Sequence, residues 1–281
     1  MKRFAVIIIF LLIPVWVSAT TYISDHFDAQ DDWVGKVGAT CYDPPSPWDG
    51  YGYYCREGFY INATGAHGGS GKGVTINWTQ SMTETALTTP TSVPTGKSEL
   101  WIGFWYKHSS GWNWGSDTTH KWYYGPETNA SDRMMINYDQ YHRAFWAGNT
   151  QFQSNIPFNV NDDEWHSVII YLKHSTGTGN NDGAIRMWWD GTEATWTGLD
   201  AHVGRTNLQC DFGSGATWTS YSCIGFQSRP NWGSGNISYY DDIIFASTEA
   251  EVTEFLGLEG EPEAPAPPTL SNVTISGGSF R

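Results

Sequence analysis

Side chains that can transfer protons gather between residues 120 and 143 of this 281-residue chain. An imidazole or a phenol held close to a substrate can take a proton as a base or return it as an acid. Nearby lysine and arginine side chains could neutralise a carboxylate on the same substrate. The alternative is structural, because a lone histidine or tyrosine on a strand is more often hydrogen-bonded within the fold. The candidate acids and bases are His120, Tyr138, Tyr141 and His142.

A second set of side chains offers the mixture of rings, amides and cations that sugar polymers need. Rings cover the apolar faces of sugars, while amides and guanidinium groups bond hydroxyls or carboxylates. Alternation along Leu100–His108 puts the even-numbered residues inward and the odd-numbered ones outward. One concave sheet could gather such outward residues into a cleft; alternatively, they face water on a convex sheet. The candidate binding residues are Trp105, Lys107, Lys121, Arg133, Asn137, Arg143, Gln227 and Arg229.

The elements that must position these residues are strands, because apolar residues repeat every second position. Val168, Ile170 and Leu172 alternate in one segment, and a second segment does the same before an Asp-Gly turn at 190–191. Residues 248–258 form the one segment that reads as a short helix. Many strands without intervening helices predict an all-β, antiparallel two-sheet β-sandwich.

Two neighbouring segments, Asp163–Lys173 and Asn181–Gly191, carry a Trp-His-x-Val motif and a later Trp-x-Asp-Gly motif. This arrangement resembles the laminin G-like and polysaccharide-lyase-like branches of the concanavalin A-like lectin/glucanase superfamily. The resemblance implies a jelly-roll sandwich whose concave face recognises a polysaccharide, within a modular carbohydrate-active protein. Two alternatives remain: a polysaccharide lyase that cleaves a uronic-acid polymer by β-elimination, and a cell-surface adhesion module.

The catalytic motifs of this superfamily are incomplete in the chain. The Glu-x-Asp-x-x-Glu strand of the glucanases is absent from the sequence, which disfavours hydrolysis by two carboxylates. The Arg-x-Glu-x-Arg, Gln-Ile-His and Tyr-x-Lys-x-Gly-x-Tyr strands of alginate lyases do not occur intact either. Whether the chain is an enzyme therefore stays open.

Calcium and disulfides are the expected structural supports. Relatives of this fold often hold a structural Ca²⁺ where the first and last strands meet, and aspartate oxygens are suitable ligands. Asp241 or Asp242 could instead simply cap a turn. Four cysteines that follow a signal peptide suggest two disulfides. Three pairings are possible, and pairs close in sequence are favoured. Each such disulfide would stabilise the folded protein by roughly 3 kcal/mol. The residues are Asp25, Asp28, Asp241 and Asp242 for calcium, and Cys41 with Cys55 and Cys210 with Cys223 for the disulfides.

Composition and charge restrict the compartment and the partners. A basic start, an apolar run and Val17-Ser18-Ala19 predict a signal peptide over residues 1–19, hence a secreted, extracellular, periplasmic or surface protein. A net charge of -14 argues against nucleic acid and against anionic membranes. We expect a monomeric sandwich over residues 20–258, followed at 259–281 by a linker rich in proline and glutamate and the start of a possible further domain.

Overall fold

The computed structural model describes segments of the chain between residues 19 and 258. They contain seventeen strands, one α-helix and two short 3₁₀ helices, and all strand pairs are antiparallel. The predicted all-β, two-sheet sandwich is therefore confirmed. The described residues are 19–34, 46–48, 58–78, 84–89, 95–114, 119–126, 133–139, 143–146, 153–156, 159, 161–177, 180, 182–197, 208–210, 223–228 and 235–258.

The larger sheet has ten strands and contains both the first and the last strand of the fold. Its path runs β13-β12-β11-β6-β17-β4-β3-β2, while β1 also pairs with β17 and β15 with β12. Strand β17 therefore holds together segments that are far apart in sequence. The strands are β1 (Thr21–Asp25), β2 (Trp33–Val34), β3 (Phe59–Asn62), β4 (Gly73–Trp78), β6 (Glu99–His108), β11 (His166–Lys173), β12 (Gly183–Trp189), β13 (Thr192–Glu193), β15 (Leu208–Cys210) and β17 (Asn236–Ala246).

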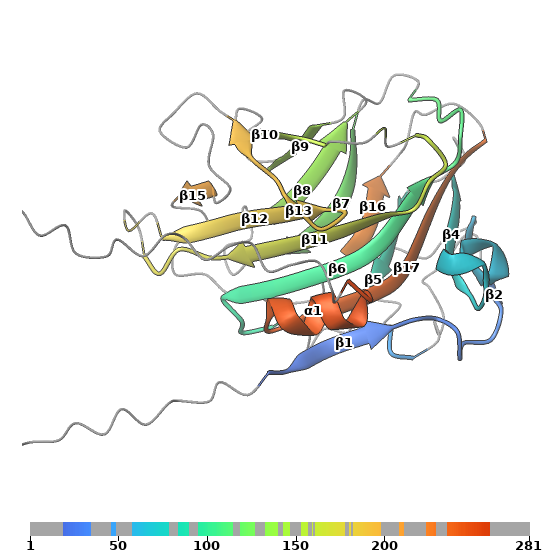
Figure 1. Cartoon of the computed structure of the whole chain (residues 1–281), viewed down its shortest axis with the longest axis horizontal. Helices are drawn as coiled ribbons and strands as arrows, with labels where there is room; N and C mark the ends of the chain where they lie inside the picture. The colour runs from blue at the N-terminus through green and yellow to red at the C-terminus, as the bar shows by residue number, and fades with distance from the viewer. Residues whose placement is uncertain are drawn as a thin grey trace, which may run out of the picture.

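The smaller sheet has seven strands in the order β14-β10-β9-β8-β7-β16-β5. In Figure 1, β7 and β8 lie above β12 and β11 of the other sheet, and β16 passes behind β11. The strands are β5 (Glu84–Thr88), β7 (Thr119–Pro126), β8 (Arg133–Asp139), β9 (Arg143–Trp146), β10 (Gln153–Asn155), β14 (Trp196–Thr197) and β16 (Cys223–Ser228).

The core lies between the two sheets and follows the predicted alternation. The even-numbered residues of β6, from Leu100 to Tyr106, are fully buried and face strands of the smaller sheet. Ile136 and Tyr138 of β8 meet them from the other side. Trp112 and Trp114, which follow β6, also belong to this core. Burial of so much aromatic surface is the main force that holds the sheets together.

A second, smaller core covers part of the outer face of the ten-stranded sheet. Helix α1 (Glu249–Phe255) begins after Thr248, whose hydroxyl accepts a hydrogen bond from the Glu251 N–H. Val252 and Leu256 pack on outward residues of the sheet such as Trp101. Figure 1 shows α1 lying between β1 and β6. The 3₁₀ helices η1 (Ala63–Gly65) and η2 (His67–Gly69) contact β17 of the same sheet.

The motif that carries the family resemblance has a structural role. Asp190 and Gly191 both have positive φ values and form the two-residue turn between β12 and β13. The Asp190 carboxylate lies 2.8 Å from Nδ1 of His166 and accepts a hydrogen bond from the Ser167 N–H at 2.8 Å. These contacts fix the start of β11 against that turn. In the described part of the chain, no helix is long and apolar enough to span a bilayer.

Candidate functional site

Two of the predicted acids and bases lie inside the core rather than in an open groove. The Tyr138 hydroxyl is 2.6 Å from Nδ1 of His120 and 2.6 Å from Nε2 of His108. His108 comes from the ten-stranded sheet, whereas His120 and Tyr138 are paired residues of the smaller one. We call these three residues the imidazole–phenol chain. It links the two sheets through the middle of the sandwich.

Burial keeps the three side chains of the imidazole–phenol chain neutral. All three residues are essentially inaccessible to solvent. Burial lowers the pKa of His120 to about 3, and it also holds the pKa of His108 well below its usual value. Burial raises the pKa of Tyr138 well above its usual value. A polymer at the surface does not reach these groups, so His120 and Tyr138 fit the structural alternative rather than the role of acid or base. Tyr141 and His142 lie outside the described residues.

The predicted binding residues divide between two faces of the sandwich, so they do not form one cleft. Trp105 and Lys107 lie on β6 of the ten-stranded sheet, whereas Arg133 and Asn137 lie on β8 and Gln227 on β16 of the other sheet. Sequence alternation identifies a face of a strand, but only long-range pairing decides which sheet that strand joins. Arg229 lies outside the described residues.

Trp105 and Lys107 are occupied by contacts within the protein. The Trp105 ring stacks on the His67 ring with 3.9 Å between centroids, and its Nε1 donates to the Leu256 carbonyl at 3.3 Å. The Lys107 ammonium lies 4.7 Å from the centre of the Tyr239 ring and 3.4 Å from an Asp163 oxygen. Trp105 therefore supports the surface around η2 and the end of α1. Lys107 is held by Asp163 and Tyr239 instead.

The register of the smaller sheet brings other predicted residues into line. Lys121 of β7 pairs with Asn137 of β8, Asn137 pairs with Phe145 of β9, and Phe145 pairs with Gln153 of β10. We call these four positions the Lys121 row. The residues on either side of position 137 in β8, Ile136 and Tyr138, are both buried. Lys121 itself is half-buried.

The remaining predicted residues of this sheet lie around that row. Arg143 pairs with Asn155 in β10, two residues along β9 from Phe145. Arg133 pairs with Pro126 at the far end of β8. Gln227 pairs with Thr85 beyond an irregularity in the β16–β5 register. Lys121, Asn137 and Arg143 are thus the predicted residues that the fold brings onto neighbouring strands in close register.

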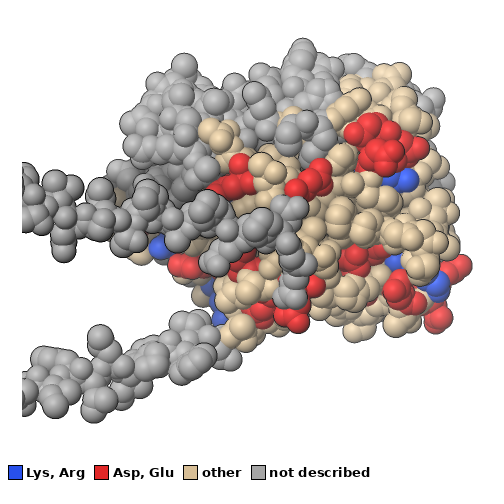
Figure 2. Space-filling model, viewed as in Figure 1, with Lys and Arg blue, Asp and Glu red and all other residues tan. Residues whose placement is uncertain are grey.

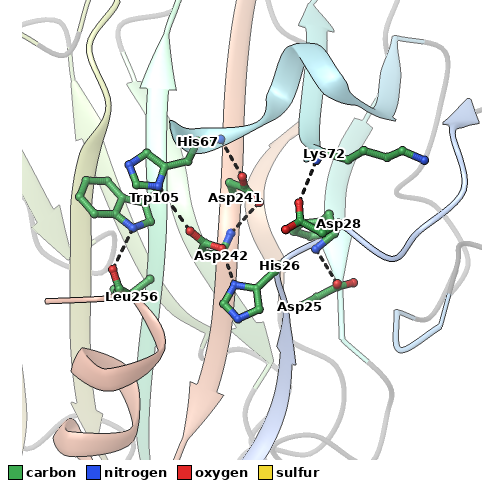
Figure 3. A network of polar contacts seen from close by, with 10 residues as sticks. Asp25, His26, Asp28, His67, Lys72, Trp105, Asp241, Asp242 and Leu256 are labelled. Carbon is green, nitrogen blue, oxygen red and sulfur yellow. Dashed lines mark hydrogen bonds and ion pairs between the residues drawn. The ribbon is translucent and has the colours of Figure 1, made fainter. Parts of the chain in front are cut away.

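The four predicted calcium ligands come together where β1, β17 and η2 meet, as Figure 3 shows. We call them the aspartate junction: Asp25, Asp28, Asp241 and Asp242. One oxygen of Asp241 accepts from the His67 N–H at 2.7 Å, and the other accepts from the Asp242 N–H at 2.8 Å. Asp25 accepts from the Phe27 N–H at 2.7 Å and from Trp48 Nε1 at 2.8 Å. Asp28 accepts from the Lys72 N–H at 3.0 Å.

Two histidines that the sequence analysis did not single out complete this junction. His26 Nδ1 lies 2.5 Å from one Asp242 oxygen, and His67 Nδ1 lies 3.4 Å from the other. The His26 ring stacks on Phe255 of α1 with 3.9 Å between centroids. The sequence signal was weak: His26 stands beside Asp25, and His67 lies within a glycine-rich segment.

The two adjacent aspartates of β17 have opposite pKa shifts. Burial raises the pKa of Asp241 to about 8, and the neighbouring Asp242 carboxylate adds to the effect. Burial alone would also raise the pKa of Asp242, but hydrogen bonds from His67 and His26 outweigh it and leave the pKa lowered. Asp242 has a left-handed backbone, φ 48°, at a break in the β17–β6 register. Such backbones are strained for residues other than glycine, asparagine and aspartate.

The calcium expectation gains no support from this arrangement. Among the described residues, no group of three or more His, Cys, Asp or Glu side chains is placed to hold a metal ion. The aspartate oxygens described above already accept hydrogen bonds from the protein, and Ca²⁺ takes six to eight oxygen ligands. Of the cysteines, Cys41 and Cys55 lie outside the described residues. Cys210 is on β15 and Cys223 on β16, in different sheets, and their pairing stays a prediction.

Carboxylates predominate on the face that carries α1. Figure 2 shows several red groups there and few blue ones. Two hollows of about 310 and 540 Å³ flank the stacked pair His26 and Phe255 on this face, and the larger is lined by Glu251 and Glu254. An anionic polymer would be repelled by that lining.

Comparison with known proteins gives a likeness in structure alone. No family model matches the sequence. No curated protein matches it either. The PL-14 alginate lyase of Aplysia kurodai superposes with a TM-score of 0.46 at 10% identity, covering 68% of this chain and 87% of that one. Cellulose induced protein Cip1 superposes with a TM-score of 0.44 at 13% identity, covering 68% of this chain and 85% of that one. Alginate lyase Aly36B superposes with a TM-score of 0.42 at 13% identity, covering 79% of this chain and 95% of that one.

Proposed function

We propose that this protein is an exported, monomeric polysaccharide-binding protein whose ligand lies along the outer face of the seven-stranded sheet. The observation that carries the proposal is the Lys121 row, which brings a cation, an amide, a ring and a second amide together on four adjacent strands. Strands lie about 4.8 Å apart, so the row extends over roughly 14 Å. That length suits several consecutive sugars of a chain.

The surroundings of the row favour this face over the other. All helices of the described residues pack against the ten-stranded sheet, α1 on β6 and β17 and the 3₁₀ helices on β17. The outer face of that sheet is also rich in carboxylates around α1. The Lys121 row, with Arg143 beside it, instead offers cations that can bond hydroxyls and carboxylates. A polymer containing uronic acids fits this chemistry best.

Retention on immobilised glycans tests the proposal. We expect the protein to be retained by a uronate polymer such as alginate more strongly than by a neutral β-glucan. Lys121→Ala and Asn137→Ala should each weaken retention by about tenfold, the effect of one good charged or amide contact. Lys173→Ala is the matched control, because Lys173 is a half-buried lysine on the opposite sheet whose partner is Glu99 at 3.6 Å. Equal binding by all variants, or loss only in Lys107→Ala, would refute the assignment of the face.

The same incubation distinguishes binding from cleavage. β-Elimination of a uronate polymer creates an unsaturated sugar that absorbs in the ultraviolet. Residues 140–142 connect β8 with β9 beside Arg143, so Tyr141 and His142 are the candidates that a lyase would use. A rise in absorbance that Tyr141→Phe or His142→Ala abolishes would change the proposal from a binding protein to a lyase. Retention without such a rise supports binding alone.

A further inference from the structure

We infer that the imidazole–phenol chain is a one-directional set of hydrogen bonds that holds strands β7 and β8 in the position the Lys121 row requires. His108, Tyr138 and His120 are then positioning residues, which act through their neighbours without touching the ligand. The inference rests on the proposed function for its consequence, but its geometry can be tested independently of any glycan.

The ends of the chain determine the direction of its hydrogen bonds. His120 Nε2 lies 3.4 Å from the Gly225 carbonyl, which can only accept. A neutral imidazole carries one N–H, so the proton of His120 is on Nε2 and its Nδ1 is an acceptor. The Tyr138 hydroxyl therefore donates to His120 across 2.6 Å. Its oxygen is left to accept from His108 Nε2–H, also across 2.6 Å.

The same count of protons determines the hydrogen bond between His108 and Asn161, at the other end of the imidazole–phenol chain. With its proton on Nε2, His108 offers Nδ1 as an acceptor. The side-chain amide of Asn161, whose oxygen stands 3.3 Å from that nitrogen, must then turn its NH₂ group toward it. Each of the four contacts then has one donor and one acceptor. The reverse direction would place an unprotonated His120 nitrogen against the Gly225 carbonyl, leaving two acceptors facing each other inside the core.

Neighbouring residues restrict the movement of these rings. The rings of His108 and Trp112 stack with 3.5 Å between centroids and an interplanar angle of 4°. The Tyr138 ring stacks on Trp122 with 4.4 Å between centroids. The phenol therefore has little freedom to leave the two imidazoles. Because the chain joins β6 to both β7 and β8, it fixes the smaller sheet relative to the larger one.

The chain and the row are consecutive residues on the same strands. His120 precedes Lys121, Tyr138 follows Asn137, and the pair His120–Tyr138 is the next step of the ladder after Lys121–Asn137. Successive residues of a strand point to opposite faces. A shift of the buried pair therefore shifts the Lys121 row with it.

Tyr138→Phe is the decisive variant, because it keeps the stacked ring and removes only the hydroxyl. We expect faster amide hydrogen exchange in β7 and β8 around residues 119–121 and 137–139, with unchanged exchange in β11 and β12. Glycan affinity should fall by about tenfold, as for one lost hydrogen bond in the row. Ile136→Val is the control, since it removes one buried methylene from the same face of β8. It should lower stability while leaving affinity within about twofold.

Nitrogen NMR of the imidazoles reads the direction of the chain directly. The wild type should show a protonated Nε2 and an unprotonated Nδ1 for both His108 and His120, and in Tyr138→Phe the exchange of the His108 proton should accelerate. The opposite tautomers, or exchange in Tyr138→Phe that resembles Ile136→Val, would overturn the inference. If the wild type binds no glycan, the proposed function fails, and the tautomers and exchange rates still decide the inference.

Discussion

His26 and Asp242 join the first strand of the sandwich to the last, with 2.5 Å between Nδ1 and Oδ1. The last backbone pair of β1 and β17 is Asp25 with Ile243, and His26 and Asp242 are the next residues of the two segments beyond it. The side-chain contact therefore continues the attachment of β1 beyond its last backbone pair. Because His67 approaches the other oxygen of the same carboxylate, Asp242 connects β1, β17 and η2.

Asp242→Asn should destabilise the protein by about 1.5 kcal/mol at pH 7, the lower end of the contribution of a hydrogen bond to a charged group. Asparagine tolerates the left-handed backbone, so the loss reports on the carboxylate rather than on backbone strain. The folded pKa of Asp242 is lowered, so its stabilisation is present above the usual value of 3.8 and is lost as the pH falls through the folded pKa. Urea unfolding at pH 7 and pH 3 measures this. A difference of the same size at both pH values would contradict the account.

Asp241 should give the opposite pH dependence. Its folded pKa is raised to about 8, so the folded state favours the protonated carboxyl. That advantage is complete below the usual value of 3.8 and is lost as the pH rises to about 8. We expect the urea midpoint to decline between pH 5 and pH 9 in the wild type. Asp241→Asn should remove this slope, whatever its effect on the absolute midpoint. A slope that the variant keeps would show that another group is responsible.

Calcium offers a separate test of the aspartate junction. Since its carboxylates are engaged by protein donors, we expect the thermal midpoint to be the same with excess Ca²⁺ and with chelator. A cation that binds the folded state would raise the midpoint with concentration, by mass action. A midpoint that rises with Ca²⁺ and loses this response in Asp241→Asn would confirm the calcium site that the sequence predicts.

Gly73→Ala should be strongly destabilising, because η1 and β4 approach each other closely beside Asp241. A Cβ at Gly73 would lie 2.0 Å from the Gly65 carbonyl oxygen, which is backbone and cannot rotate away. Overpacking of this kind costs about 1–3 kcal/mol. Ser70→Ala, at an exposed position of the same segment, should stay within about 0.5 kcal/mol of the wild type. Similar unfolding midpoints for the two variants would show that the contact is looser than described.

Local patterns in the sequence predicted the strands well, because alternation and capping are local. Glu99–His108 has the predicted bounds, and α1 lies within the predicted segment 248–258, with Thr248 as its N-cap. The candidate site was harder to predict, because it depends on pairing between distant segments. Nothing near residue 105 indicates that β6 and β8 join different sheets. His120 was a candidate acid or base because an imidazole can transfer protons, whereas its partner Tyr138 connects it to His108 across the core.

The most direct test of the central claim is an amide NMR titration of the labelled protein with a uronate oligosaccharide. We predict that the largest shifts fall on β7, β8, β9 and β10 around Lys121, Asn137, Phe145 and Gln153, and that the amides of α1 and β1 stay unchanged. Shifts concentrated around His26, Trp105 and Phe255 would contradict the account and place the ligand on the opposite sheet.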